Sequence, residues 1–217
     1  MEVLKMKMLN KKVMKELEGI FKDFDKQVTF KFFTQEFECR FCRDTRQLLT
    51  EISGLSDKIK MDVYDFVADK AEVETYGIKR IPAVVVMDGK DYDIKFYGIP
   101  GGYEFSSLVE AMKMVSTGES GLAQETKDFL DSLEKDVHLQ VFVTPTCPYC
   151  PGAVILAHRM AYYSPKVKAD MVEASEFPDM AQKYNVMGVP RTVINETEFQ
   201  EGSAPEDMLV EKIKATL

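Results

Sequence analysis

The chain has 217 residues, of which 45% are hydrophobic and 29% charged, and its formal net charge is −8. This composition is that of an ordinary globular protein with enough apolar residues to build a core in two small domains. No stretch of about 20 apolar residues occurs, so no membrane span is expected. The negative charge argues against a nucleic-acid partner, which would require a basic surface.

The N-terminal segment from Met1 to Lys12 opens with basic residues but carries neither the apolar run nor the cleavage site of a signal peptide. We interpret it as the lead-in to an amphipathic helix, because apolar residues recur at steps of three and four from position 9 to 24. A cytoplasmic location is expected.

The first half of the chain then alternates between strand and helix patterns. Runs rich in β-branched and aromatic residues predict strands, and turn residues such as Gly54 and the pair Gly101-Gly102 separate the elements. The predicted helices are 9–24, 42–52, 70–76 and 105–115, and the predicted strands are 28–33, 59–66, 83–87 and 93–97.

The second half shows the same pattern after a small polar linker at 116–121. The predicted helices are 123–135, 148–163, 179–184 and 205–215, and the predicted strands are 138–143, 167–173, 191–195 and 198–200. We therefore expect an α/β protein of two tandem units, residues 1–117 and 118–217, each a mixed sheet flanked by helices.

The duplication extends to the chemistry. A shift of 108 residues carries the motif Cys39-Arg40-Phe41-Cys42 onto Cys147-Pro148-Tyr149-Cys150. The same shift carries Tyr76 to Tyr184 and Pro82 to Pro190. All four cysteines of the chain belong to these two motifs.

A Cys-x-x-Cys motif between a strand and a helix is typical of dithiol–disulfide chemistry. The free backbone N–H groups and the dipole of a helix start favour a thiolate, which is the attacking form of cysteine. We assign Cys39 and Cys147 as nucleophiles. Cys42 and Cys150, placed one turn into the helix, are assigned as the thiols that resolve the mixed disulfide. The different central residues predict different reduction potentials.

Pro82 and Pro190 each follow the nucleophile of their own unit by 43 residues and directly precede a predicted buried strand. Cis peptide bonds would explain these prolines, because the bend exposes the backbone of Ile81 and Val189 beside the cysteines. An extended substrate segment can pair with that backbone. Ile81, Pro82, Val189 and Pro190 are therefore the predicted substrate-binding residues.

These motifs resemble the thioredoxin-fold superfamily, and residues 143–150 are similar to glutaredoxin. The tandem arrangement resembles the protein disulfide oxidoreductases of thermophilic archaea and bacteria over essentially the whole chain. The resemblance implies reduction of protein disulfides, with possible oxidation and isomerisation. It also implies protein substrates, a thioredoxin-reductase-like flavoenzyme as electron donor, and no cofactor beyond the cysteine pairs.

The chain departs from thioredoxin at one position in each unit. Thioredoxin has a buried Asp six residues before its first cysteine, whereas this chain has Phe33 and Val141 there. The repeat-equivalent residues Asp65 and Glu173, at strand ends, are weak candidates for a proton-transfer carboxylate.

Two alternatives stay open from the sequence. A tandem unit of this kind can be a dedicated electron relay for a peroxide-reducing system rather than a broad oxidoreductase. The four cysteines could also bind one zinc ion as a tetrahedral thiolate site in a binding module. Under the redox interpretation, in contrast, we expect no metal.

Overall fold

The computed structural model describes residues 7–217, so the first half of the expected lead-in segment, Met1 to Met6, lies outside the described residues. The helices are α1 Lys11–Lys22, α2 Cys42–Ser53, α3 Lys70–Thr75, α4 Phe105–Thr117, α5 Gln124–Asp131, α6 Cys150–Tyr163, α7 Pro178–Lys183 and α8 Glu206–Lys214, with a 3₁₀ turn η1 at Gly102–Glu104. The strands are β1 Val28–Thr34, β2 Ile59–Asp65, β3 Ala83–Met87, β4 Ile94–Tyr97, β5 Val137–Val143, β6 Val167–Glu173, β7 Arg191–Ile194 and β8 Glu198–Glu201.

The element order predicted from the sequence is confirmed, with most boundaries shifted by one or two residues. The largest difference is α5, which ends at Asp131 rather than at residue 135. Both the N–H and the hydroxyl of Ser132 donate to the carbonyl of Phe129, which closes the last turn early. The predicted boundary between residues 117 and 118 stays a prediction, although α4 does end at Thr117.

The strands form one continuous eight-stranded sheet in the order β2-β1-β3-β4-β6-β5-β7-β8. The first strand of each half, β1 or β5, pairs in parallel with the second and antiparallel with the third. The halves join where β4 runs parallel to β6, in a register that sets Ile94 beside Ala169 and Tyr97 beside Val172. The sequence predicted two mixed sheets but not this junction.

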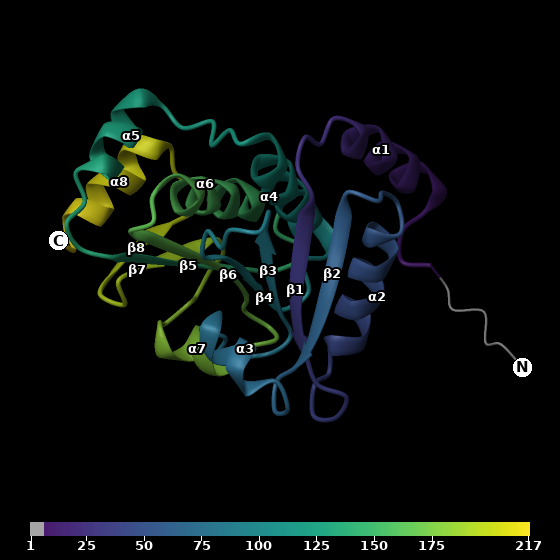
Figure 1. Ribbon diagram of the computed structural model, residues 1–217. Coiled ribbons are helices and arrows are strands. Elements are labelled where there is room, and N and C mark those ends of the chain that lie inside the picture. The colour runs from purple at the N-terminus through teal and green to yellow at the C-terminus, as the bar shows by residue number, and fades with distance from the viewer. Residues whose placement is uncertain (1–6) are drawn as a thin grey trace, which may run out of the picture.

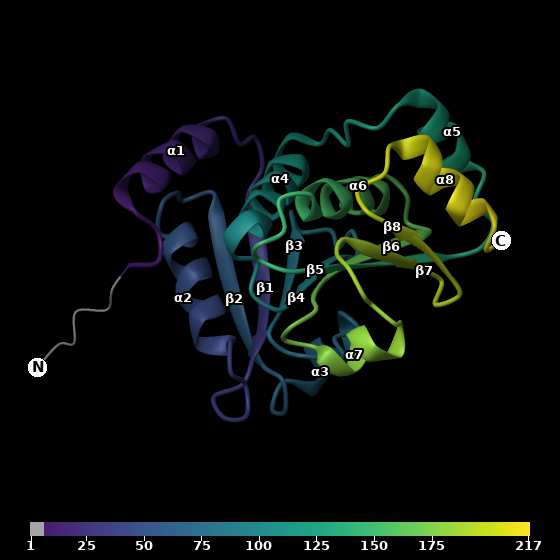
Figure 2. The same ribbon diagram turned by 180° about the vertical axis from the view of Figure 1, so that it is seen from behind.

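Helices cover both faces of the sheet. Figure 1 shows α3 and α7 side by side below it, with α4 and α6 above it, and the view from behind in Figure 2 agrees. Alternate residues of β3 enter two different cores: Val84 and Val86 lie in the large core under α4 and α6, and Ala83 and Val85 lie in the small core over α3 and α7. This alternation is expected for a strand buried on both faces.

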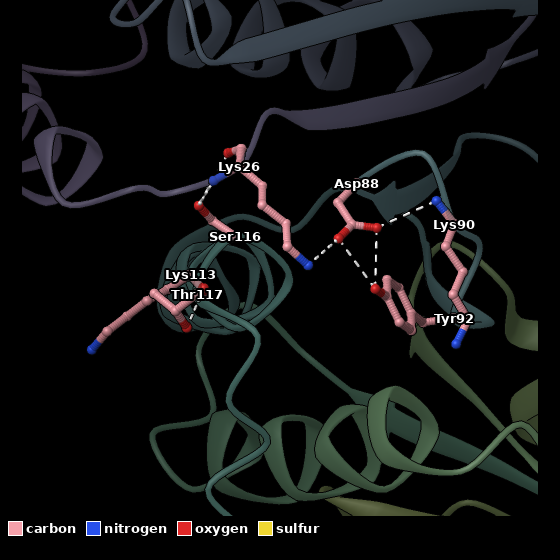
Figure 3. Close-up of polar contacts among 7 residues, drawn as sticks. All are labelled: Lys26, Asp88, Lys90, Tyr92, Lys113, Ser116 and Thr117. Atoms are coloured by element: carbon pink, nitrogen blue, oxygen red, sulfur yellow. Dashed lines mark hydrogen bonds and ion pairs between the residues drawn. The ribbon is translucent and has the colours of Figure 1, made fainter.

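A polar cluster lies at the end of the sheet where β3 reaches its C-terminus. Lys26 Nζ lies 2.9 Å from a carboxylate oxygen of Asp88, and the Tyr92 hydroxyl donates to the same carboxylate (Figure 3). The Ser116 hydroxyl on α4 also donates to the backbone carbonyl of Lys26 (Figure 3). The ring of Tyr92 contacts that of Tyr162 on α6 with centroids 4.5 Å apart, so this cluster links the two halves.

The opposite edge carries both cysteine motifs. The strand pairings make β1 and β5 parallel to each other, so their C-terminal ends lie at the same edge of the sheet. The N-terminal ends of the antiparallel strands β3 and β7 lie there too. Within residues 7–217, no helix is both long and apolar enough to cross a bilayer.

Candidate active site

Each motif forms its own disulfide, Cys39–Cys42 and Cys147–Cys150, with Cα atoms 5.5 Å apart in both. Cys39 is half-buried and Cys147 is 8% exposed, whereas Cys42 and Cys150 are buried more deeply, at 3% and 0%. The first cysteine of each pair is thus the more accessible one. This is the order that the assignment of nucleophile and resolving thiol requires.

Helix α2 begins where the sequence predicted, and α6 begins two residues later than predicted. α2 starts at Cys42 and α6 at Cys150, with Phe41 and Tyr149 as their N-cap residues. The first cysteine therefore precedes the helix by three residues, and the predicted helix start at Pro148 is wrong. Pro151, rather than Pro148, lies in the first turn of α6. The N–H groups of a first turn have no partner within the helix, so the N–H that proline lacks costs no hydrogen bond there.

Pro82 and Pro190 directly precede β3 and β7, as their place in the sequence predicted. The bonds Ile81–Pro82 and Val189–Pro190 are both cis, which confirms that prediction. At the second site the Cys147 sulfur lies 3.6 Å from the backbone carbonyl oxygen of Val189. Ile81 and Val189 are half-buried at the same sheet edge as the cysteines, and their role in substrate binding stays a prediction.

Two exposed apolar side chains lie close in sequence to the second cysteine pair or to its cis proline. Tyr149, between the cysteines, is 72% exposed, and Met187, two residues before Val189, is 87% exposed. At the first site the equivalent residues are Phe41, which is half-buried under the guanidinium of Arg40, and Lys79. The two sites therefore share a backbone but differ in surface chemistry.

A buried carboxylate lies near the second site and comes from the first half of the chain. Glu104 is 1% exposed, and it ends the turn η1, which packs on α6. The adjacent N–H of Tyr103 donates to the carbonyl of Pro145, in the loop that leads to Cys147. One oxygen of Glu104 accepts from the Ser107 hydroxyl, and the other has no partner among the described residues. Burial raises the pKa of Glu104 to about 7, so it is suited to exchange protons near neutral pH.

Glu104 was not among the residues predicted from the sequence, although its position in the sequence carries a signal. Glu104 continues the apolar stripe of α4 that runs through Leu108, Met112 and Val115. A charged residue on the buried face of a helix is uncommon unless it is paired or functional.

Replacing Glu104 by glutamine is expected to stabilise the fold above pH 7. The raised pKa means that the folded chain keeps a proton which the unfolded chain loses above pH 4.5, so stability falls as pH rises from 4.5 to about 7. Glutamine removes this dependence while still accepting from Ser107. Urea unfolding should show a gain of about 3 kcal/mol above pH 7 and none below pH 4.5. A difference that does not change with pH would contradict this account.

Of the two carboxylates that the sequence suggested, only Glu173 is buried, at 3% exposed. Asp65 instead closes a turn by accepting from the N–H groups of Val67 and Ala68. Glu173 accepts from the N–H of Glu176, and each of these glutamates has one buried oxygen without a partner among the described residues. Burial raises the pKa of Glu176 to about 7, and the carboxylates of Glu173 and Asp44 act in the same direction. This acidic pair lies on β6 and just after it, on the same sheet edge, between the strands that lead into the two sites.

The four cysteines lie in two separate pairs. A single zinc ion bound by all of them, the alternative raised from the sequence, would require them to meet. Among residues 7–217, no group of three or more cysteine, histidine or acidic side chains is placed to hold a metal ion. The geometry therefore supports two independent dithiol–disulfide sites.

Comparison with known proteins agrees with this geometry. Residues 137–215 match the family model described as Thioredoxin domain. The crystal structure of a protein disulfide oxidoreductase from Aeropyrum pernix K1 superposes on this chain with a TM-score of 0.90, and the two sequences are 32% identical. The match covers 95% of this chain and 93% of that chain. This chain belongs to the tandem thioredoxin-fold family that includes this oxidoreductase. It is therefore a thiol–disulfide oxidoreductase with two Cys-x-x-Cys sites.

Members of the same structural family occur inside larger enzymes. The NTD_N/C domain of alkylhydroperoxide reductase AhpF from Enterococcus faecalis is 30% identical with a TM-score of 0.87, over 94% of this chain and 99% of that chain. The F component of alkyl hydroperoxide reductase from Staphylococcus aureus is 29% identical over 175 residues, which are 80% of this chain and 32% of that protein. The chain spans about a third of the length of the curated relatives it matches.

Proposed function

We propose that this tandem thioredoxin-fold protein reduces disulfides of protein substrates, and that it can also oxidise or rearrange them. The observation that carries the proposal is the second site. The Cys147 sulfur lies 3.6 Å from the Val189 carbonyl oxygen beside the cis proline. The side chains of Tyr149, between the two cysteines, and Met187, two residues before Val189, are exposed. An open apolar surface beside free backbone groups suits an extended protein segment better than a small polar molecule.

The reaction transfers two electrons and uses only cysteine sulfur. The Cys147 thiolate attacks a substrate disulfide and forms a mixed disulfide, and the first substrate thiolate leaves and takes up a proton. The Cys150 thiolate then attacks Cys147, which forms the Cys147–Cys150 disulfide and releases the second substrate thiol. Glu104 is the buried acid that can supply or accept a proton during these steps. Cys39 and Cys42 would perform the same chemistry at the first site.

The electron donor that we propose is a thioredoxin-reductase-like flavoenzyme in the cytoplasm, which would reduce one or both cysteine pairs again. The cysteine pairs themselves carry the electrons, so the cycle needs no further group within this chain.

A protein-disulfide reduction assay tests the proposal. The parent chain, the Cys39→Ser/Cys42→Ser variant, the Cys147→Ser/Cys150→Ser variant and the variant lacking all four thiols would reduce insulin under the same conditions. We expect activity from the parent, partial activity from at least one pair variant, and none from the four-serine variant. Full activity of the four-serine variant would overturn the oxidoreductase function.

A second candidate is a dedicated relay for a peroxide-reducing system, favoured by the likeness to the F component of alkyl hydroperoxide reductase. A relay should reduce one partner protein far faster than it reduces insulin. Equal rates for the two substrates would favour the broad oxidoreductase and count against the relay.

A further inference from the structure

We infer that the first site takes small disulfides that carry carboxylates, whereas the second site takes protein disulfides. This inference rests on the proposed function and assigns a substrate class to each site. It starts from a pocket of about 310 Å³ beside the first cysteine pair, lined by Cys39, Cys42, Arg43, Arg46, Glu36 and Thr34 among others. A pocket of this size holds a small molecule but not a folded chain.

Two cations of this pocket have no polar partner among residues 7–217. Arg43 and Arg46 lie one turn apart on α2, and both side chains are exposed. Neither guanidinium makes a hydrogen bond or an ion pair with any residue in the described part of the chain. Guanidinium groups bind carboxylates in a planar, two-point geometry, so two of them in one pocket fit an anion with one or two carboxylates.

The opposing charge in the pocket is smaller. Among the described residues that line the pocket, Glu36 is the one acidic residue, and it faces two arginines. The start of α2, a helix of 12 residues, adds the positive end of its dipole. The pocket, which both cysteines of the first pair help to line, therefore carries a net positive charge.

The repeat supplies an internal comparison. The residues of the second site that correspond to Arg43 and Arg46 are Pro151 and Val154, and both are buried in the core side of α6. The second site therefore has no cation at either position and presents Tyr149 and Met187 instead. The same backbone thus carries one charged and one apolar surface.

The chemistry at the first site balances within the cysteine pair. The Cys39 thiolate attacks one sulfur of a small disulfide RS–SR, forming Cys39–S–S–R and releasing RS⁻, which takes up a proton. The Cys42 thiolate then attacks the Cys39 sulfur, closing the Cys39–Cys42 disulfide and releasing the second RS⁻. The dithiol loses two electrons, the small disulfide gains two, and the arginines hold the carboxylate of R during both steps.

A series of small disulfides of similar size and different charge tests the inference. The probes are 3,3′-dithiodipropionate, which is a dianion, 2-hydroxyethyl disulfide, which is neutral, and cystamine, which is a dication. The Cys147→Ser/Cys150→Ser variant would be reduced in advance with dithiothreitol, freed of it, and mixed with each probe. The chain has no tryptophan, so oxidation would be followed by acid quenching and mass spectrometry after thiol alkylation.

We expect the dianion to react about tenfold faster than the neutral probe and the dication to react slowest. Two exposed ion pairs stabilise the bound dianion by about enough to change the rate tenfold. Arg43→Gln/Arg46→Gln should bring the three rates within about twofold of one another, whereas Arg43→Lys/Arg46→Lys should keep the order. Lys15→Gln/Lys22→Gln on α1, both exposed, makes the same change in net charge and should leave the order intact. The Cys39→Ser/Cys42→Ser variant, which retains only the second site, should show no such order.

Three outcomes would overturn the inference. Equal rates for the three probes in the parent first-site variant would show that the pocket does not select charge. Equal rates for the small probes, together with faster reduction of an acidic protein disulfide than of a basic one, would assign the arginines to a protein partner instead. Failure of the first-site variant to reduce even the neutral probe, while the parent chain still reduces insulin, would overturn the inference alone and leave the proposed function standing.

Discussion

Cys147→Ser is expected to lower disulfide exchange at the second site by at least about a thousandfold, because a serine hydroxyl does not form the attacking anion near neutral pH. The measurement uses the Cys39→Ser/Cys42→Ser background, so that the first site does not contribute. Initial rates of insulin reduction would be compared with those of the background variant.

The resolving position should behave differently in the same background. Cys150→Ser leaves Cys147 able to attack, but the mixed disulfide that forms has no neighbouring thiol to release it. Non-reducing electrophoresis should therefore show a covalent adduct with a protein substrate for Cys150→Ser and none for Cys147→Ser. Adducts of equal amount from both variants would contradict the assignment of nucleophile and resolving thiol.

Gly102→Ala is expected to cost about 3 kcal/mol or more of folding stability and to lower activity at the second site selectively. Gly102 has φ +60°, and a Cβ there would overlap the carbonyl oxygen of Pro145. That carbonyl accepts from Tyr103 and belongs to the loop that leads to Cys147. The substitution therefore forces apart the contact that holds Glu104 and this loop together.

Gly77→Ala is the matched control for Gly102→Ala. Its φ of +61° is nearly the same, but no atom lies within 4 Å of the position that a Cβ would take, so only the backbone strain of about 1 kcal/mol applies. Urea unfolding and second-site activity would be measured for both variants. Equal losses of stability would show that the crowding at Pro145 has no effect and would contradict the account.

Features that depend on local sequence were predictable. The strand at Ala83–Met87 is a run of five apolar residues, and its ends agree with the prediction because proline and the Asp88-Gly89 turn bound it. The cysteine pairs and the cis prolines were also predictable, because the 108-residue repeat showed both members of each constellation together.

Features that depend on contacts between the halves were not predictable. The pairing of β4 with β6 joins residues about 75 positions apart and leaves no periodic signal. The position of Glu104 near the second site was not predictable for the same reason, because this residue belongs to the first half; only its burial could have been inferred from the apolar stripe of α4.

The most direct test of two distinct redox sites is the reduction potential of each cysteine pair. It would be measured in the two pair variants, Cys39→Ser/Cys42→Ser and Cys147→Ser/Cys150→Ser, equilibrated in dithiothreitol or glutathione buffers. We predict that both remaining pairs exchange reversibly, with potentials that differ by at least about 30 mV, which corresponds to about 1.4 kcal/mol for a two-electron couple. Equal potentials, or a pair that does not exchange with the buffer, would contradict the claim that the same fold holds two differently poised redox sites.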